Sequence, residues 1–111
     1  MGQKVKVMKI ITMCGSLKFE SDIRYWSERL ELEGNCVLSI IYPTDDDKDA
    51  YTPKQHKLLD IMHKKRIDMS DAIFVVNKNG YVGKSTKDEI DYAKKRGKEV
   101  LFLENYLITG R

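Results

Sequence analysis

The sequence lacks long hydrophobic runs and contains little proline. Its apolar stretches, such as Ile10 to Cys14, fall well short of the roughly 20 residues that cross a bilayer, so we expect no membrane interaction. The first residues, Met1 to Lys4, lead directly into the expected strand at 5–14, so we expect no signal peptide and a cytoplasmic protein. Repeats and low-complexity segments are also absent, and residues 1–111 are therefore expected to form one domain.

Cysteine is scarce, and its spacing is unlike that of a metal site. Cys14 and Cys36 form no CxxC pair and no zinc-binding pattern. Both fall in segments that we predict to be buried strands, so we expect reduced core thiols, no metal site and no cofactor. The acidic run Asp45-Asp46-Asp47 is interpreted as a solvated loop, because nothing nearby supplies histidine or further ligands.

The charge of the chain is nearly balanced. It has 20 basic and 17 acidic residues, a net charge of +3, which is too small to indicate a nucleic-acid partner. The basic clusters 64–66 and 94–96 fall at the ends of expected helices, where cations interact favourably with the helix dipole. We therefore expect no nucleic-acid partner.

Strand-like and helix-like segments alternate along the chain. We expect strands at 5–14, 36–42, 71–77 and 99–104, helices at 17–33, 53–67 and 86–96, and a turn or short extra element after 105. This alternation predicts an α/β fold with right-handed crossovers, in which a parallel sheet of four to five strands has helices on both faces. Leu58, Ile61 and Met62 mark the expected apolar face of the second helix, and His63 is interpreted as a solvated side chain.

Such sheets bind ligands beyond the carboxyl ends of their strands. The segment Cys14-Gly15-Ser16-Leu17-Lys18 follows the first expected strand. Gly15 allows a close backbone approach to a ligand, and the Ser16 hydroxyl and Lys18 cation suit a phosphate or carboxylate. A tight turn with Ser16 as the helix N-cap explains the same residues equally well.

A second loop, Gly80-Tyr81-Val82-Gly83-Lys84-Ser85, follows the third expected strand. It resembles part of a P-loop, but the position where a P-loop needs its first glycine is Lys78, so we reject an ATPase. An anion at this helix start remains an open interpretation. Tyr81 could stack on a nucleobase, although tyrosines at such positions are more often packing residues.

Glu89 is the most informative residue of the third helix. Thr86 and Glu89 have the spacing of a capping box, which is the simpler interpretation from spacing alone. Glu89 also lies one turn into a helix whose start faces the expected crevice, where a carboxylate is placed to attack an electrophilic carbon. Asp68, at the junction of the second helix and third strand, is interpreted from its position as an ion-pairing residue.

These segments resemble one enzyme family. Cys14-Gly15-Ser16-Leu17-Lys18, Asp71-Ala72-Ile73-Phe74-Val75-Val76 and the run from Gly83 to Glu89-Ile90-Asp91-Tyr92-Ala93 resemble the nucleoside 2-deoxyribosyltransferase family, with its 2'-deoxynucleoside 5'-monophosphate N-glycosidase relatives. The resemblance implies a flavodoxin-like sandwich and an enzyme that cleaves the N-glycosidic bond of a small nucleoside or nucleotide. It assigns Glu89 as the nucleophile and Asp68 as the proton donor. Ser16 and Lys18 would contact a 5'-phosphate.

The sequence departs from the family at two positions. Met13 replaces a tyrosine at the end of the first strand, and Gly83 replaces an aspartate before the nucleophile. Both changes favour hydrolysis over base exchange, with a non-catalytic nucleotide-binding module as the alternative. A structural domain without a small ligand is a third, weaker reading. The family's sites are commonly completed across a subunit interface, so the resemblance also implies a homo-oligomer, a dimer or higher.

Overall fold

The computed structural model describes residues 8–44 and 50–109. Its strands are β1 (Ile10–Gly15), β2 (Cys36–Leu38), β3 (Ala72–Val76) and β4 (Glu99–Phe102). Its helices are α1 (Glu20–Leu32), α2 (Pro53–Asp68), α3 (Lys84–Lys95) and α4 (Leu103–Thr109), with short 3-10 helices η1 (Leu17–Phe19) and η2 (Lys78–Gly80).

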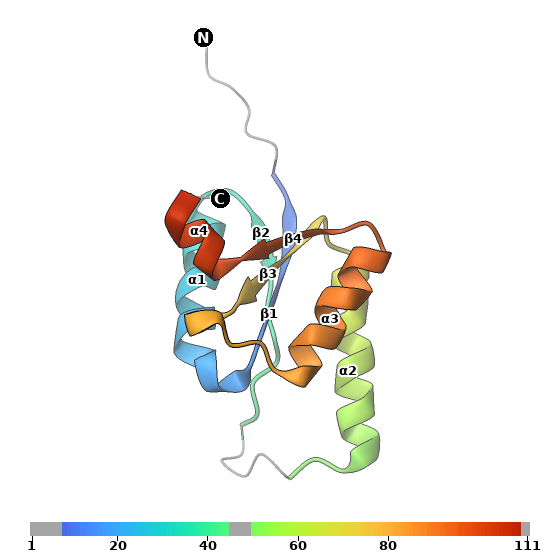
Figure 1. The fold of residues 1–111 in the computed structure, drawn as a ribbon. Helices are drawn as coiled ribbons and strands as arrows, with labels where there is room; N and C mark the ends of the chain where they lie inside the picture. The colour runs from blue at the N-terminus through green and yellow to red at the C-terminus, as the bar shows by residue number, and fades with distance from the viewer. Residues whose placement is uncertain (1–7, 45–49, 110–111) are drawn as a thin grey trace.

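The strands form one parallel, four-stranded sheet in the order β2-β1-β3-β4. The chain runs from β1 outward to β2 and then crosses to β3 on the other side of β1. Helices α1 and α4 cover one face of the sheet, and α2 and α3 cover the other (Figure 1). The predicted flavodoxin-like three-layer sandwich is confirmed. Its topological switch point, where ligands of such folds bind, lies between β1 and β3.

Strand β3 shows why both faces must be covered. All five of its side chains are buried, which is typical of a central parallel strand. Phe74 faces α1 and α4 and lies against the rings of Trp26 and Tyr106. Ile73 and Val75 belong to the opposite cluster, beneath α2 and α3. The uninterrupted apolar run from 72 to 76 therefore follows directly from two-sided packing.

Helix α2 begins where the sequence predicts but turns a different face inward. Thr52 caps it in a capping box with Gln55, followed by Pro53. Leu58 and Ile61, however, are 54% and 49% exposed. His63 and Ile67 are the helix residues that are buried, so the predicted apolar face and the solvated His63 were both wrong.

Other expectations need correction or fall outside the described residues. Strand β2 ends at Leu38 and pairs only with β1, so it is a short edge strand. Cys36 begins this edge strand and is exposed, whereas Cys14 is buried as predicted. The chain after β4 forms α4, a helix. The acidic run at 45–49 and the start of the first expected strand lie outside the residues that the structure describes.

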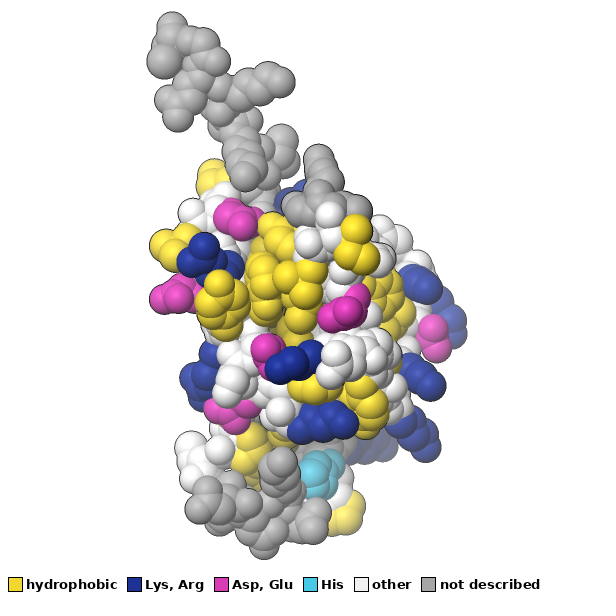
Figure 2. All heavy atoms as spheres, turned by 60° about the vertical axis from the view of Figure 1, so that its left-hand side comes forward, with side chains coloured by type: hydrophobic (Ala, Val, Ile, Leu, Met, Phe, Trp, Pro, Cys, Tyr) yellow, Lys and Arg dark blue, Asp and Glu magenta, His cyan; other side chains and the backbone are white. Residues whose placement is uncertain are grey.

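The surface is mixed in character. On the face drawn in Figure 2, lysine and arginine side chains are interspersed with acidic and apolar ones. Within residues 8–44 and 50–109, no helix combines the length and apolar character needed to cross a membrane.

Candidate active site

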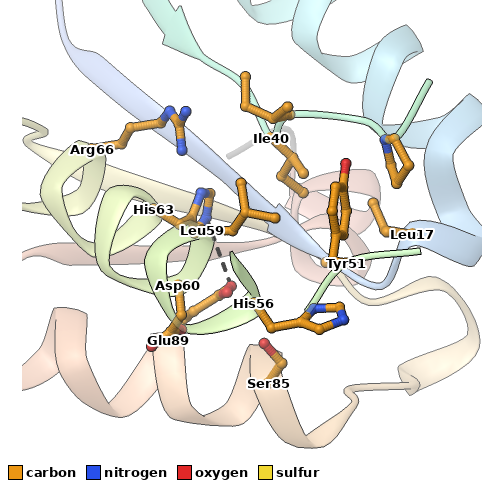
Figure 3. A pocket seen from close by; sticks show the side chains of 13 residues that line it. Leu17, Ile40, Tyr51, His56, Leu59, Asp60, His63, Arg66, Ser85 and Glu89 are labelled. Carbon is orange, nitrogen blue, oxygen red and sulfur yellow. Dashed lines mark ion pairs between the residues drawn. The ribbon is translucent and has the colours of Figure 1, made fainter. Parts of the chain in front are cut away.

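A pocket of about 250 Å³ opens at the carboxyl end of β1 (Figure 3). It is bounded by the segment after β2, by one face of α2 from His56 to Arg66 and by the first turns of α3. This volume lies near the roughly 300 Å³ lower end of small-molecule sites. The pocket therefore occupies the position that the topology indicates for a ligand.

The pocket has an apolar side and a polar side. Its apolar and aromatic lining comes from Leu17, Ile40, Ile41, Pro43, Tyr51 and Leu59. Its polar lining comes from His56, Asp60, His63, Arg66, Ser85 and Glu89. A ligand with one flat apolar part and one hydroxyl-rich part matches this division.

Glu89 turns into the pocket. Helix α3 begins at Lys84 with Gly83 as its N-cap, so Thr86 is the third helical residue and cannot be the cap. The Thr86–Glu89 capping box expected from spacing is therefore not formed. The Glu89 side chain is free of that role and lines the pocket with only 9% of the residue exposed.

Burial controls the protonation of Glu89. Removal from water raises the pKa of its carboxyl to about 7. The charges of Asp60 and Asp88 contribute to this rise, while hydrogen bonds from Cys14 and Ser85 oppose it by stabilising the carboxylate. Glu89 therefore exchanges its proton near neutral pH, which is where a catalytic carboxyl is most useful.

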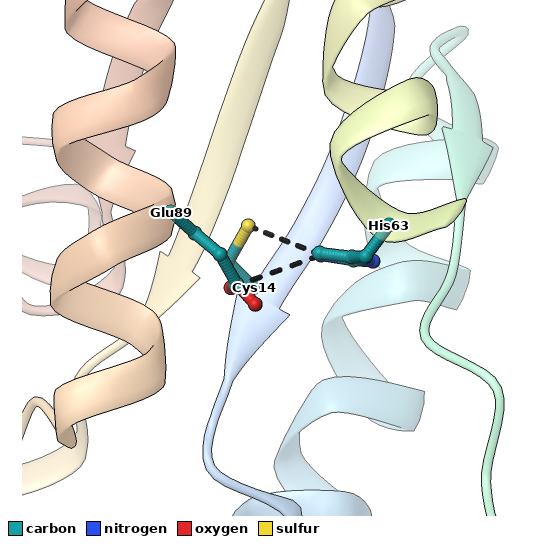
Figure 4. A group of neighbouring side chains, drawn as sticks. All are labelled: Cys14, His63 and Glu89. Carbon is teal, nitrogen blue, oxygen red and sulfur yellow. Dashed lines mark hydrogen bonds and ion pairs between the residues drawn. The ribbon is translucent and has the colours of Figure 1, made fainter. Parts of the chain in front are cut away.

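His63 reaches the same point from α2. Its Nε2 lies 3.8 Å from Glu89 Oε1 and 3.5 Å from Cys14 Sγ (Figure 4). Burial, followed by the charge of Arg66, lowers the pKa of the imidazole to about 4. His63 is thus neutral at pH 7, so its contact with Glu89 is between an uncharged ring and a carboxyl rather than a salt bridge.

Cys14 is the most deeply buried member of this group. It is completely buried at the end of β1. Burial and the adjacent Glu89 carboxylate raise the pKa of its thiol well above its usual value. Reactive cysteines have depressed pKa values and partial exposure, so the Cys14–His63 contact lacks the properties of a nucleophilic cysteine dyad in the uncomplexed protein.

Gly15 at the end of β1 and Ser16 after it have structural roles. Gly15 has φ of 154°, and a Cβ there would lie 3.2 Å from the carbonyl oxygen of Val76. Its lack of a side chain is therefore required by packing, although its backbone also lines the pocket. Ser16 caps η1, accepting a hydrogen bond from the Lys18 backbone N–H at 3.3 Å.

Several predicted binding residues lie beside the pocket rather than in it. The Lys18 ammonium lies over the Tyr81 ring, 3.4 Å from its centroid, and Tyr81 packs edge-on against Phe19. Gly80 has a positive φ of 78° within η2, and Gly83 caps α3. Of the second loop, the hydroxyl-bearing Ser85 is the member that lines the pocket.

Asp68 lies apart from Glu89. It ends α2, and its carboxylate accepts a hydrogen bond of 2.8 Å from the Tyr92 hydroxyl. Arg96 Nη1 is 3.9 Å from the same oxygen. Asp68 follows the pocket-lining Arg66 by two residues, which is about 200° around the helix, so its side chain leaves α2 on another side and does not line the pocket.

The polar residues that sequence reasoning missed come mostly from α2. His56, Asp60, His63 and Arg66 all line the pocket. Asp60, His63 and Arg66 are three residues apart and share one face of the helix. That spacing could have indicated a polar inward face, but the apolar residues at 58, 61 and 62 favoured the opposite face, which is exposed.

Comparison with known proteins supports the fold alone. No family model and no curated protein matches the sequence. A conserved protein from Enterococcus faecalis V583 has a similar structure, with a TM-score of 0.61 and 18% sequence identity. The match covers 86% of this chain and 63% of that protein, so the chain spans less than two thirds of its length. At this identity the likeness concerns architecture and not activity.

Proposed function

We propose that the protein cleaves the N-glycosidic bond of a nucleoside or its 5'-monophosphate, with Glu89 as the nucleophile. One observation carries this proposal: the Glu89 carboxyl is released from helix capping and faces a ligand-sized pocket at the carboxyl end of β1. The sequence resemblance to the nucleoside 2-deoxyribosyltransferase family supplies the reaction class.

The proposed reaction has two steps. The ionised Glu89 oxygen bonds to the anomeric carbon as the bond from that carbon to the base nitrogen breaks, and the base leaves with the electron pair. Water then attacks the glycosyl ester, which restores the carboxyl group and releases the sugar. In both steps the carboxylate also stabilises the positive charge that develops on the sugar.

The two sides of the pocket suit the two parts of a nucleoside. Tyr51, Ile40 and Leu59 form an apolar wall against which a flat base can pack. The sugar then lies toward Glu89 and Ser85. Arg66 lines the same pocket and offers a cation for a phosphate group.

A proton must reach the departing base. Asp68 was the residue that the resemblance assigned, but its carboxylate is held by Tyr92 away from the pocket. Asp60 is the carboxyl group of α2 that lines the pocket. We therefore move the proposed proton-delivery role from Asp68 to Asp60.

Two replacements favour water over a second base as the acceptor. Met13 is fully buried, and Gly83 has no side chain with which to hold an incoming base. The proposal is therefore hydrolysis rather than base exchange.

The exposed side of α2 supports the expected homo-oligomer. Leu58, Ile61 and Met62 are exposed on the face of α2 opposite the pocket, and the C-cap residue Met69 is exposed at the end of this helix. An apolar surface of this kind is typical of subunit contacts. Sedimentation equilibrium decides whether the chain is a monomer.

The proposal is tested by incubating the protein with nucleosides, deoxynucleosides and their 5'-monophosphates and measuring free base by chromatography. Release from at least one compound is the expected result. No release from any of them by folded protein contradicts the proposal, and binding without release, measured by calorimetry, would instead indicate the non-catalytic nucleotide-binding module.

The rate of base release should rise as pH increases through about 7. Glu89 attacks as a carboxylate, and burial raises its pKa to about 7, so the active ionised form is lost at lower pH. The measurement is kcat/KM across the neutral range in the presence of a chelator. A rate that falls as pH rises through this range would show that base release requires the protonated form of Glu89 and not the carboxylate.

A further inference from the structure

Cys14, His63 and Glu89 bring three different ligand atoms together from β1, α2 and α3 (Figure 4). The thiol sulfur, an imidazole nitrogen and a carboxylate oxygen all lie within 4.8 Å of one another. All three side chains are buried. Because 49 residues separate Cys14 from His63, the sequence offers no local spacing that indicates a metal site.

The distances match the edges of a tetrahedral zinc centre. Zinc binds these atom types at about 2.0–2.3 Å, so tetrahedral geometry separates neighbouring ligand atoms by about 3.3–3.8 Å. Cys14 Sγ and His63 Nε2 are 3.5 Å apart, and His63 Nε2 and Glu89 Oε1 are 3.8 Å apart. The Cys14 sulfur and the Glu89 carboxylate oxygen also lie within 4.8 Å of each other. The three ligand atoms therefore need to move little to bind an ion.

We propose that Cys14, His63 and Glu89 form a binding site for a divalent transition metal of the zinc class, with a fourth coordination position open to the pocket. One thiolate, one imidazole and one carboxylate form the mixed ligand set that zinc prefers. Three protein ligands and an open position are characteristic of reactive rather than purely structural zinc sites.

Charge and access both support this site. A divalent ion with one thiolate and one carboxylate is neutral overall, which suits a buried position. The charges of Asp60 and Asp88 add negative potential at Glu89, although Lys64 Nζ pairs with both of them at 3.2 and 2.9 Å, and the charge of Arg66 acts on His63 in the opposite sense. His63 and Glu89 line the pocket, so an ion that enters from solvent meets these two ligands, and the buried Cys14 sulfur lies within 4.8 Å of both.

Binding must displace protons. The Cys14 thiol loses its proton on forming the metal–sulfur bond, and any proton on Glu89 is also released to solvent. A bound metal would occupy the carboxylate oxygen that the proposed glycosidic reaction needs. The metal would therefore inhibit base release, while the binding itself does not depend on that reaction taking place.

The test is titration of the chelator-treated, metal-free protein with Co²⁺, followed by absorption spectroscopy. We expect a sulfur-to-cobalt charge-transfer band and strong visible bands of tetrahedral cobalt, saturating at one ion per chain and removed by Zn²⁺. The band is expected in wild type and in Cys36→Ser, which alters the exposed cysteine. It should be absent in Cys14→Ser.

Glu89→Gln gives a second test that leaves both cysteines in place. Its affinity for Co²⁺ should fall by more than about 100-fold, the upper end of the loss caused by outer-shell changes. If Cys14→Ser does not fold, this variant decides the question. No charge-transfer band in wild type, an unchanged band in Cys14→Ser, or unchanged affinity in Glu89→Gln overturns the site. None of these readouts requires a nucleoside, so the glycosidase proposal stands or fails separately.

Discussion

Replacing Glu89 by glutamine is expected to reduce the release of base by on the order of 10³-fold or more. The amide has the shape of the carboxyl group but cannot carry the negative charge that attacks the anomeric carbon. Glu89 lies in α3 with 9% of the residue exposed, and its side chain reaches the pocket. The loss should appear in kcat, because the change removes the reacting atom while leaving the remainder of the pocket in place.

The matched control for this variant is Asp91→Asn. Asp91 is an exposed carboxylate two positions further along the same helix, so this change removes a like charge without touching the pocket. Its rate should equal that of wild type. If Glu89→Gln retains the wild-type rate and a native circular-dichroism spectrum, Glu89 is not the nucleophile.

The same Glu89→Gln change should stabilise the fold at neutral and alkaline pH. Burial raises the pKa of Glu89 from its usual 4.5 to about 7, so the folded protein binds this proton more tightly than the unfolded chain does. Below pH 4.5 the group is protonated in both states and costs nothing. Above about pH 7 the folded protein contains a buried charge, which costs about 3 kcal/mol.

Glutamine is neutral at every pH and removes this cost. The free energy of unfolding of Glu89→Gln minus that of wild type should therefore increase as pH rises from 4.5 to about 7, ending near +3 kcal/mol. Urea denaturation with a chelator present measures the difference, and Asp91→Asn supplies the baseline. A difference that stays flat with pH, or decreases, contradicts the burial of an ionising carboxyl.

His63 acts in the opposite direction over nearly the same range. Its pKa is lowered from 6.5 to about 4, so the folded protein holds this proton less tightly and gains stability as pH rises between these values. In wild type the two contributions oppose each other. The difference between variant and wild type cancels the His63 contribution, which the pH dependence of either protein alone contains.

The fold was largely predictable because its determinants are local. The apolar run from 72 to 76 indicates a central parallel strand, and Thr52-Pro53 indicates the start of α2. The length of β2 was less predictable, since an edge strand pairs on one side only, and β2 leaves its neighbour after Leu38 although β1 continues to Gly15. The exposure of Cys36 follows from that edge position.

The site was predictable only in part. Glu89 could be placed near the crevice because α3 follows a strand that ends there. His63 could not, because the apolar residues of α2 suggested an inward face that in fact lies on the surface. A helix that lines a polar pocket presents polar residues inward, so hydrophobic periodicity points to the wrong side. Asp60 and Arg66 were missed for the same physical reason.

The most direct test of the central claim is the anomeric configuration of the product formed in methanol–water. A glycosyl ester on Glu89 requires two displacements at the anomeric carbon, so a β-nucleoside should give the β-methyl glycoside, with retention, as observed by proton NMR. The methyl glycoside does not interconvert between anomers, so the configuration is preserved for measurement. Formation of the α-methyl glycoside would show that the acceptor attacks directly and that Glu89 never bonds to the sugar.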